Sequence, residues 1–134
     1  MDRIVECVPN FSEGRDRAVI DRIVEAMTGI EGATVLDVDP GNATNRTVVT
    51  LVGEPDAVTE AAFLGIRQAA ELIDMRHHKG EHPRMGATDV CPFVPVRGIT
   101  MEECAGLAAT LGRRVGETLG IPIFLYENAA TPEG

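Results

Sequence analysis

Apolar and polar residues alternate with two different periods along the chain, and each period predicts one kind of element. Short runs of β-branched and other apolar residues, bounded by proline, glycine or asparagine, predict strands. Longer stretches with apolar residues at 3.6-residue spacing and charges between them predict amphipathic helices. The predicted strands are 4–8, 33–39, 47–52, 90–96 and 121–126, and the predicted helices are 15–27, 55–75 and 100–119.

Local signals refine these elements. Ser12 is placed to cap the first helix, and the sequence from Thr100 to Glu103 is a capping box that opens the third. Pro92 and Pro95 each remove a backbone donor, so we expect an edge or irregular strand at 90–96. Residues 76–88 have no apolar period, which predicts a loop of a length that tends to be functional.

The predicted elements follow the order β-α-β-β-α-β, with a further α-β unit after them. The first six have the split βαβ order of the ferredoxin-like fold. We therefore expect an α+β fold, a ferredoxin-like sandwich with an added αβ unit, in which the helices pack on one face of an open mixed sheet. No linker or repeat divides residues 1–134, which predicts a single domain.

The charge balance disfavours several classes of protein. The 134 residues include 12 Lys and Arg and 21 Asp and Glu, a formal net charge of −9, which opposes general binding to nucleic acids or anionic membranes. No stretch approaches the roughly 18 apolar residues of a membrane span, and the N-terminal sequence MDRIVECVPN lacks the apolar core of a secretory signal. We expect a cytoplasmic protein that binds neither nucleic acid nor membrane.

The cysteines indicate a reducing environment. Cys7, Cys91 and Cys104 are an odd number and show no C-x-x-C spacing. This pattern predicts neither a disulfide framework nor a zinc knuckle. We expect reduced and mostly buried thiols.

All three histidines lie within six residues, in the segment RHHKGEHPRMG at 76–86. Between Arg76 and Arg84 this segment carries a net charge of +2 with neutral histidines, in a chain of net −9. A local excess of positive charge attracts anionic ligands. The segment is therefore the first candidate for a functional site.

Two chemistries compete for this segment. His78, Glu81 and His82 match H-x-x-E-H, a zinc-binding pattern whose histidines share one helical face. Gly80 weakens a helix between them and Pro83 favours extended backbone at His82, so we expect no metal site. A histidine that titrates near neutrality beside charged groups suits general acid–base catalysis, and His82 is our candidate for that role.

Two further polar segments, 9–14 and 39–46, follow predicted strands. Both are rich in the residues that turns require, so turns are the simpler interpretation. Arg46 is the stronger candidate for binding, because a guanidinium forms a fork that fits a carboxylate.

Three segments together resemble the formiminotransferase family: VECVPNFSEGR at 5–15, LDVDPG with TNRTV within 36–48, and HKGEHPRMGATDVCPFVPVRG at 78–98. This family includes the glutamate formimidoyltransferases and the N-terminal part of formimidoyltransferase-cyclodeaminase. The resemblance implies transfer of a formimidoyl group from N-formimidoyl-L-glutamate to N5 of tetrahydrofolate, a step of histidine degradation, with tetrahydrofolate as co-substrate and no metal. It also implies a ferredoxin-like N-terminal subdomain.

The resemblance further implies roles for individual residues. The catalytic histidine of the segment GEHPRMG falls on His82. The candidates for binding substrate or folate are Asn10, Asp39, Asn45, Arg46, Lys79 and Arg84. The basic residues are candidates for the carboxylates, the asparagines for the pterin or the formimidoyl group, and the aspartate for orienting His82 or a substrate nitrogen. For the asparagines and the aspartate, local turn structure is the alternative.

Members of this family continue with a C-terminal subdomain beyond the position where this sequence ends. We expect the chain to associate with such a subdomain or to form a homodimer. The alternatives are an incomplete or noncatalytic half that acts as a folate-binding or assembly domain, a related transferase with a formyl donor, and a metal hydrolase that uses His78 and His82.

Overall fold

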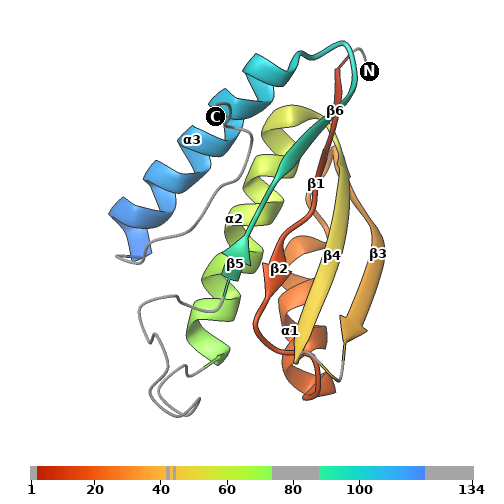
Figure 1. Ribbon diagram of the computed structural model, residues 1–134, viewed down its shortest axis with the longest axis vertical. Coiled ribbons are helices and arrows are strands. Elements are labelled where there is room, and N and C mark those ends of the chain that lie inside the picture. Colours follow the sequence, from red (N-terminus) through yellow and green to blue (C-terminus); the bar gives the residue numbers. More distant parts are fainter. Residues whose placement is uncertain (1–2, 42, 44, 74–87, 120–134) are drawn as a thin grey trace.

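The computed structural model describes residues 3–41, 43, 45–73 and 88–119. Figure 1 shows their arrangement as strands and helices of one α+β unit. The strands are β1 (Ile4–Cys7), β2 (Asn10–Phe11), β3 (Ala33–Gly41), β4 (Arg46–Gly53), β5 (Thr88–Val90) and β6 (Phe93–Arg97), and the helices are α1 (Arg17–Met27), α2 (Pro55–Leu72) and α3 (Met101–Leu119).

The described strands form one open sheet in which every pairing is antiparallel. β3 pairs along one side of β4, and β1 and β2 lie one after the other along its other side. β6 and β5 pair in turn with β1 and β2. The α+β class is confirmed, whereas the prediction of a mixed sheet is wrong for these strands. Each of the crossovers α1 and α2 connects two strands that flank a common neighbour, so the connected strands never pair in parallel.

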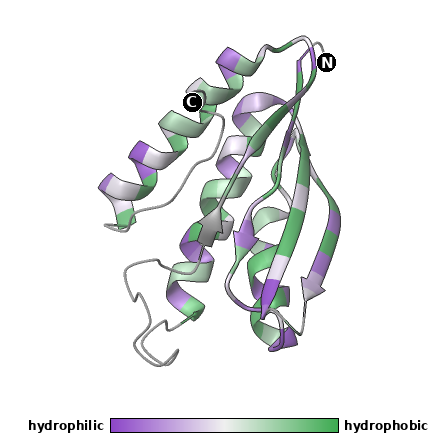
Figure 2. Cartoon of the chain, in the orientation of Figure 1, coloured by the Kyte–Doolittle hydropathy of each residue, from purple (hydrophilic) through white to green (hydrophobic). Residues whose placement is uncertain are grey.

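The helices cover one face of the sheet (Figure 1). α2 packs on β1 and β4 and contacts both α1 and α3, and α3 also packs on β6. Alternate residues of β4, Thr47, Val49 and Leu51, are buried on this helix-covered face. Figure 2 shows the alternation of hydrophobic and hydrophilic residues along α3 that lets it bury a single stripe. Among the described residues, nothing covers the opposite face, which we call the open face.

A β-bulge at Leu36 decides which side chains of β3 reach the open face. Val35 lies opposite Leu51 on the helix-covered face, but Asp37 lies opposite Thr50, so the register shifts between them. Leu36 is the extra residue, and its side chain is 60% exposed. Residues two apart in a regular strand share a face, and one extra residue reverses that relation. The bulge therefore places the aspartates of β3 on the open face.

The start of α1 corrects one prediction. Asp16, not Ser12, caps this helix, because its carboxylate accepts hydrogen bonds from the backbone N–H groups of Ala18 and Val19 at 3.1 and 3.4 Å. The helix begins at Arg17, two residues later than predicted, which carries Ser12 out of capping range.

The predicted capping box of α3 is confirmed. The backbone N–H of Glu103 donates to Thr100 Oγ1 at 3.0 Å, and the backbone N–H of Thr100 donates to Glu103 Oε1 at 2.9 Å. α2 ends at Leu72, three residues before the predicted end, because Ile73 is already extended.

Two strands depart from the sequence pattern. β2 lies within the polar segment 9–14, for which turns are predicted, and the strand predicted at 90–96 is divided into β5 and β6 with Pro92 between them. Pro95 lies in β6, an outer strand, as expected for a residue without a backbone donor. The strand predicted at 121–126 lies outside the described residues.

Candidate functional site

Polar residues of two strands lie in one row of the sheet. Asp39 of β3 and Asn10 of β2 both lie opposite Val48, on the two sides of β4. Directly opposed residues of antiparallel strands point to the same face. Strands are spaced about 4.8 Å apart, so the backbones of Asp39 and Asn10 lie about 10 Å apart across β4. The row places an exposed carboxylate and a half-buried amide together on the open face.

Arg46 adds a positive charge next to this row. It is the first residue of β4, lies opposite Gly41 and stands two residues before Val48, so it shares the open face. Its side chain is exposed. An acid, an amide and a guanidinium within one corner of the sheet can hold a ligand that carries both a carboxylate and a cationic nitrogen group.

Asn45 is occupied by a structural contact. Its side-chain Oδ1 accepts a hydrogen bond from the backbone N–H of Gly14 at 2.9 Å. Its φ of 54° is a left-handed conformation, which asparagine tolerates better than most residues. Asn10 also makes a local bond, since its Nδ2 donates to the carbonyl oxygen of Val8 at 3.1 Å.

The loop before α1 packs directly on the start of β4. A Cβ added to Gly14 would lie 2.4 Å from the backbone nitrogen of Arg46 and 2.5 Å from the carbonyl oxygen of Gly41, so only glycine fits. Thr47 Oγ1 donates a hydrogen bond to the carbonyl oxygen of Glu13. These contacts join the two polar segments, 9–14 and 39–46, into one corner.

Glu13 completes this corner, although the sequence pattern does not single it out. Its carboxylate accepts hydrogen bonds from the backbone N–H groups of Arg15 and Asp16 at 3.0 and 2.8 Å. The loop is thereby folded into the start of α1, which Asp16 caps. An acidic residue shortly before an amphipathic helix is the one signal in the sequence that points to this role.

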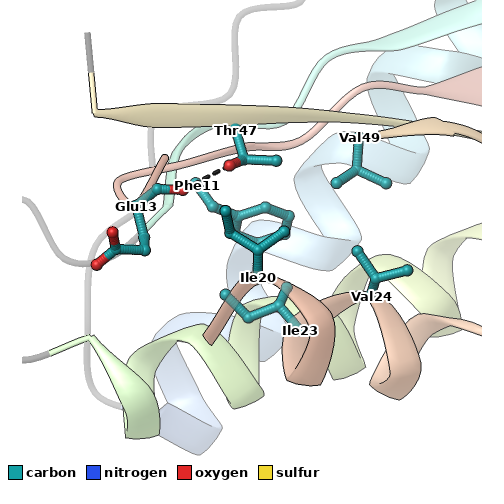
Figure 3. A pocket seen from close by; sticks show the side chains of 7 residues that line it. All are labelled: Phe11, Glu13, Ile20, Ile23, Val24, Thr47 and Val49. Atoms are coloured by element: carbon teal, nitrogen blue, oxygen red, sulfur yellow. Dashed lines mark hydrogen bonds between the residues drawn. The ribbon is translucent and has the colours of Figure 1, made fainter. Parts of the chain in front are cut away.

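The opposite face of the same corner holds an apolar depression between α1 and β4 (Figure 3). Its empty volume is about 160 Å³, below the roughly 300–1,000 Å³ of small-molecule sites. It is lined by Phe11, Glu13, Ile20, Ile23, Val24, Thr47 and Val49. No residue predicted from the sequence as a site residue lines it, so it belongs to the packing of α1.

The remaining predicted site residues, His82, Lys79 and Arg84, lie outside the described residues, as do His77 and His78. The described chain resumes at Thr88, which lies opposite Phe11 in the pairing of β5 with β2. The first described residue after the histidines therefore lies opposite the neighbour of Asn10 on β2.

The described residues contain neither a cluster of metal-ligating side chains nor a helix that could span a membrane. No group of three or more His, Cys, Asp or Glu side chains in that part of the chain could hold a metal ion. None of α1, α2 and α3 combines the length and the hydropathy that a membrane span requires.

Comparison with known proteins gives one family and several close relatives. The family described as "Formiminotransferase domain, N-terminal subdomain" matches residues 4–134. Formimidoyltransferase-cyclodeaminase of Dictyostelium discoideum is 58% identical over 131 residues, which are 98% of this chain and 24% of that protein. Glutamate formimidoyltransferases of Streptococcus pyogenes serotype M1 and Thermoplasma acidophilum are 53% and 54% identical over 98% and 95% of this chain, and over 44% and 42% of their own lengths.

The chain thus spans less than half the length of these curated relatives. Among solved structures, MupZ from Pseudomonas fluorescens aligns with 98% of this chain and 91% of its own, at a TM-score of 0.46 and 12% identity. A likeness at that level carries no argument about fold or function.

Proposed function

Because the chain belongs to the formiminotransferase family and matches its N-terminal subdomain, we propose that it takes part in transfer of a formimidoyl group from N-formimidoyl-L-glutamate to N5 of tetrahydrofolate. The products are 5-formimidoyltetrahydrofolate and L-glutamate, and tetrahydrofolate acts as co-substrate without a metal. We place this reaction of histidine degradation in the cytoplasm.

The observation that carries the proposal is the corner of Asp39, Asn10 and Arg46 on the open face. Formimidoylglutamate has two carboxylates and an amidine that is a cation when protonated. Arg46 suits one carboxylate, and Asp39 suits the amidine. We assign the remaining carboxylates, including that of the folate glutamate tail, to Lys79 and Arg84. Asn10 and Asn45 are the candidates near the pterin or the formimidoyl group.

His82 is the proposed general acid and base. It takes the proton from N5 of tetrahydrofolate while N5 attacks the formimidoyl carbon, and it then protonates the glutamate nitrogen as the tetrahedral adduct collapses. Catalysis of this kind contributes on the order of 10²–10⁴ in rate, and the rest of the acceleration comes from holding both substrates in attack geometry.

We also propose that the sheet is of the ferredoxin-like kind. Its strands and first two helices follow the β-α-β-β-α-β order if β1 with β2, and β5 with β6, each count as one interrupted strand. In both halves of this order the crossover skips one strand position, which is the split βαβ arrangement. α3 is then the first element of the added unit.

A second candidate function is that of an incomplete half that binds folate or assembles with a C-terminal subdomain. The open face favours it, because Leu36, Val94 and Val96 are 60%, 41% and 56% exposed. Val94 lies opposite Glu6 in the pairing of β6 with β1, on the open face. Large apolar side chains left exposed on the strands of an uncovered sheet are compatible with an interface. The partner we propose is the C-terminal subdomain, with a second copy of this chain as the alternative.

One experiment separates these functions. The chain is titrated calorimetrically with 5-formyltetrahydrofolate. In separate samples with tetrahydrofolate as acceptor, release of glutamate from formimidoylglutamate is assayed, by the chain alone and with the C-terminal remainder of the Streptococcus pyogenes relative. We expect His82→Ala to lower the transfer rate by about 10²-fold or more with folate binding retained. The matched control, His77→Ala, should keep the rate.

Each other outcome has a definite meaning. Activity that survives His82→Ala contradicts the catalytic assignment. Binding or turnover that needs the added subdomain identifies the chain as an incomplete half. Transfer from formylglutamate in preference to formimidoylglutamate identifies the related formyl donor, and zinc bound by the purified protein favours the hydrolase.

A further inference from the structure

Two thiols from distant parts of the sequence lie in contact inside the core. The Sγ atoms of Cys7, the last residue of β1, and Cys91, the first residue after β5, are 3.3 Å apart. Both side chains are fully buried, and both thiols are free. The proposed transfer reaction uses neither of them, so the pair requires a separate explanation.

The sheet holds the two thiols in this position. Cys7 lies opposite Phe93 in the pairing of β1 with β6, and the backbone N–H of Val8 donates to the carbonyl oxygen of Pro92 at 3.0 Å. The backbone is therefore hydrogen-bonded immediately after both cysteines. Since a disulfide has an S–S distance of about 2.05 Å, the two sulfur atoms need to approach by only about 1.2 Å.

We propose that Cys7 and Cys91 form a reversible oxidation site, which closes as an intramolecular disulfide when the protein meets a small-molecule disulfide such as oxidised glutathione. One cysteine thiolate attacks glutathione disulfide and releases one glutathione thiolate, leaving a mixed disulfide. The second cysteine thiolate attacks the protein sulfur of that mixed disulfide and expels the second glutathione. The two cysteines lose two electrons, one glutathione disulfide gains them, and the two cysteine protons end on the two glutathione thiols.

Burial controls how fast this exchange proceeds. Removal from water raises the pKa of the Cys7 thiol well above its ordinary value, and the neighbouring Cys91 raises it further. The thiolate is the attacking form, so exchange depends on local opening of the core. We therefore expect slow oxidation of the native protein and faster oxidation in urea below the unfolding midpoint.

The bond would link two strands beside the candidate site. Val90, which precedes Cys91, pairs with Asn10, which follows Cys7 by three residues. The disulfide would thus join the segment before Asn10 to the residue after Val90, next to the row that contains Asn10. It would also join residues 84 apart in the sequence, which restricts the unfolded chain and shifts the urea midpoint upward.

The test equilibrates the whole chain in sub-denaturing urea with glutathione buffers of falling ratio of reduced to oxidised form. Free thiols are then trapped with N-ethylmaleimide, and intact mass and unreduced peptides are measured. Cys104 is also buried, on α3, and lies near enough to act on the Cys7 thiol, so it is the alternative disulfide partner and Cys104→Ser is the matched control. Oxidised wild type should carry one maleimide in place of three and oxidised Cys104→Ser none in place of two. Both should regain two reactive thiols in dithiothreitol and show linked Cys7 and Cys91 peptides before reduction.

Three results would overturn the proposal: three trapped thiols in the most oxidising buffer, a stable glutathione adduct in place of the internal bond, or a linkage to Cys104. An oxidised protein with a lower urea midpoint than the reduced protein would also overturn it, because the bond would then be incompatible with the fold. Cys7→Ser should carry only glutathione adducts. If that variant does not fold, the peptide maps of wild type and Cys104→Ser decide the question.

Discussion

Asp39 and Asp37 offer a comparison between two carboxylates on the same strand and the same face. Only Asp39 shares its row with Asn10, whereas Asp37 lies opposite Thr50. If the proposed role in binding the amidine is correct, Asp39→Asn should weaken binding of formimidoylglutamate about tenfold or more, about 1.4 kcal/mol, by calorimetry. Asp37→Asn should change this binding by less than about twofold, or about 0.4 kcal/mol, because Asp37 lies outside the row that contains Asn10. Equal losses would show that the net charge of β3, and not the position of Asp39, controls binding.

Gly14 is the residue on which the contact between the two polar segments depends. Gly14→Ala would place a Cβ within 2.4 Å of the Arg46 backbone, and we expect such overpacking to lower the free energy of unfolding by about 1–3 kcal/mol. Gly106, within α3, is the control, because nothing lies within 4 Å of an added Cβ there. Gly106→Ala should raise stability by about 0.5–1 kcal/mol through helix propensity. Urea denaturation of both variants measures the difference, and destabilisation by both would contradict the steric argument.

At the scale of the element, the length of β3 matters more than the chemistry of its bulged residue. Deleting Leu36 removes the bulge, so either the aspartates after it turn into the core or the apolar residues before it turn outward. We expect a loss of several kcal/mol or failure to fold, because unpaired carboxylates would be buried. Leu36→Ser keeps the register and should change the free energy of unfolding by no more than about 0.5 kcal/mol. A folded deletion variant with native urea midpoint would refute this account of the register.

The capping box of α3 predicts a pH dependence. Hydrogen bonding from the backbone N–H of Thr100 lowers the pKa of the Glu103 carboxyl below its ordinary value of 4.5, and the nearby charge of Arg3 acts in the same direction. A lowered folded-state pKa means that the carboxylate stabilises the helix above pH 4.5 and loses this effect as the pH falls through the folded-state pKa. The stability difference between wild type and Glu103→Gln should therefore shrink as the pH falls below 4.5. A difference in urea midpoint that stays constant from neutral pH to pH 3 would exclude this mechanism.

The difference between local and distant interactions explains which features could be predicted from the sequence. The helices and the capping box of Thr100 and Glu103 follow from contacts within a few residues, so pattern and spacing predict them. β2 consists of two residues whose pairing partners on β4 and β5 are distant in the sequence, so no local pattern identifies it. The motifs indicate Asn10 and Asp39 separately, but their common row depends on the bulge at Leu36 and on the register of β4. Proximity of this kind is set by the sheet as a whole.

For the whole molecule, the open face predicts how the chain meets its proposed partner. Val96 on β6 and Met101 on α3 are 56% and 58% exposed, but only Val96 belongs to the sheet. With the C-terminal remainder of the Streptococcus pyogenes relative as ligand, Val96→Asp should weaken association at least about tenfold, a change of about 1.4 kcal/mol. Met101→Asp should leave it unchanged. Sedimentation velocity gives both values, and a larger effect of Met101→Asp would move the interface to the helical side.

The prolines of the outer strands have a further consequence for a chain that exposes valines on a broad sheet face. Pro40 lies in β3 and Pro95 in β6, and both strands are at an edge of the sheet. A strand that adds to an edge needs backbone N–H groups to bond with, and proline supplies none. The two edge strands are therefore poor templates for fibril growth, even though the open face is uncovered. The chain can therefore stay monomeric until a partner packs on the open face, because the edge strands β3 and β6 resist pairing with further copies.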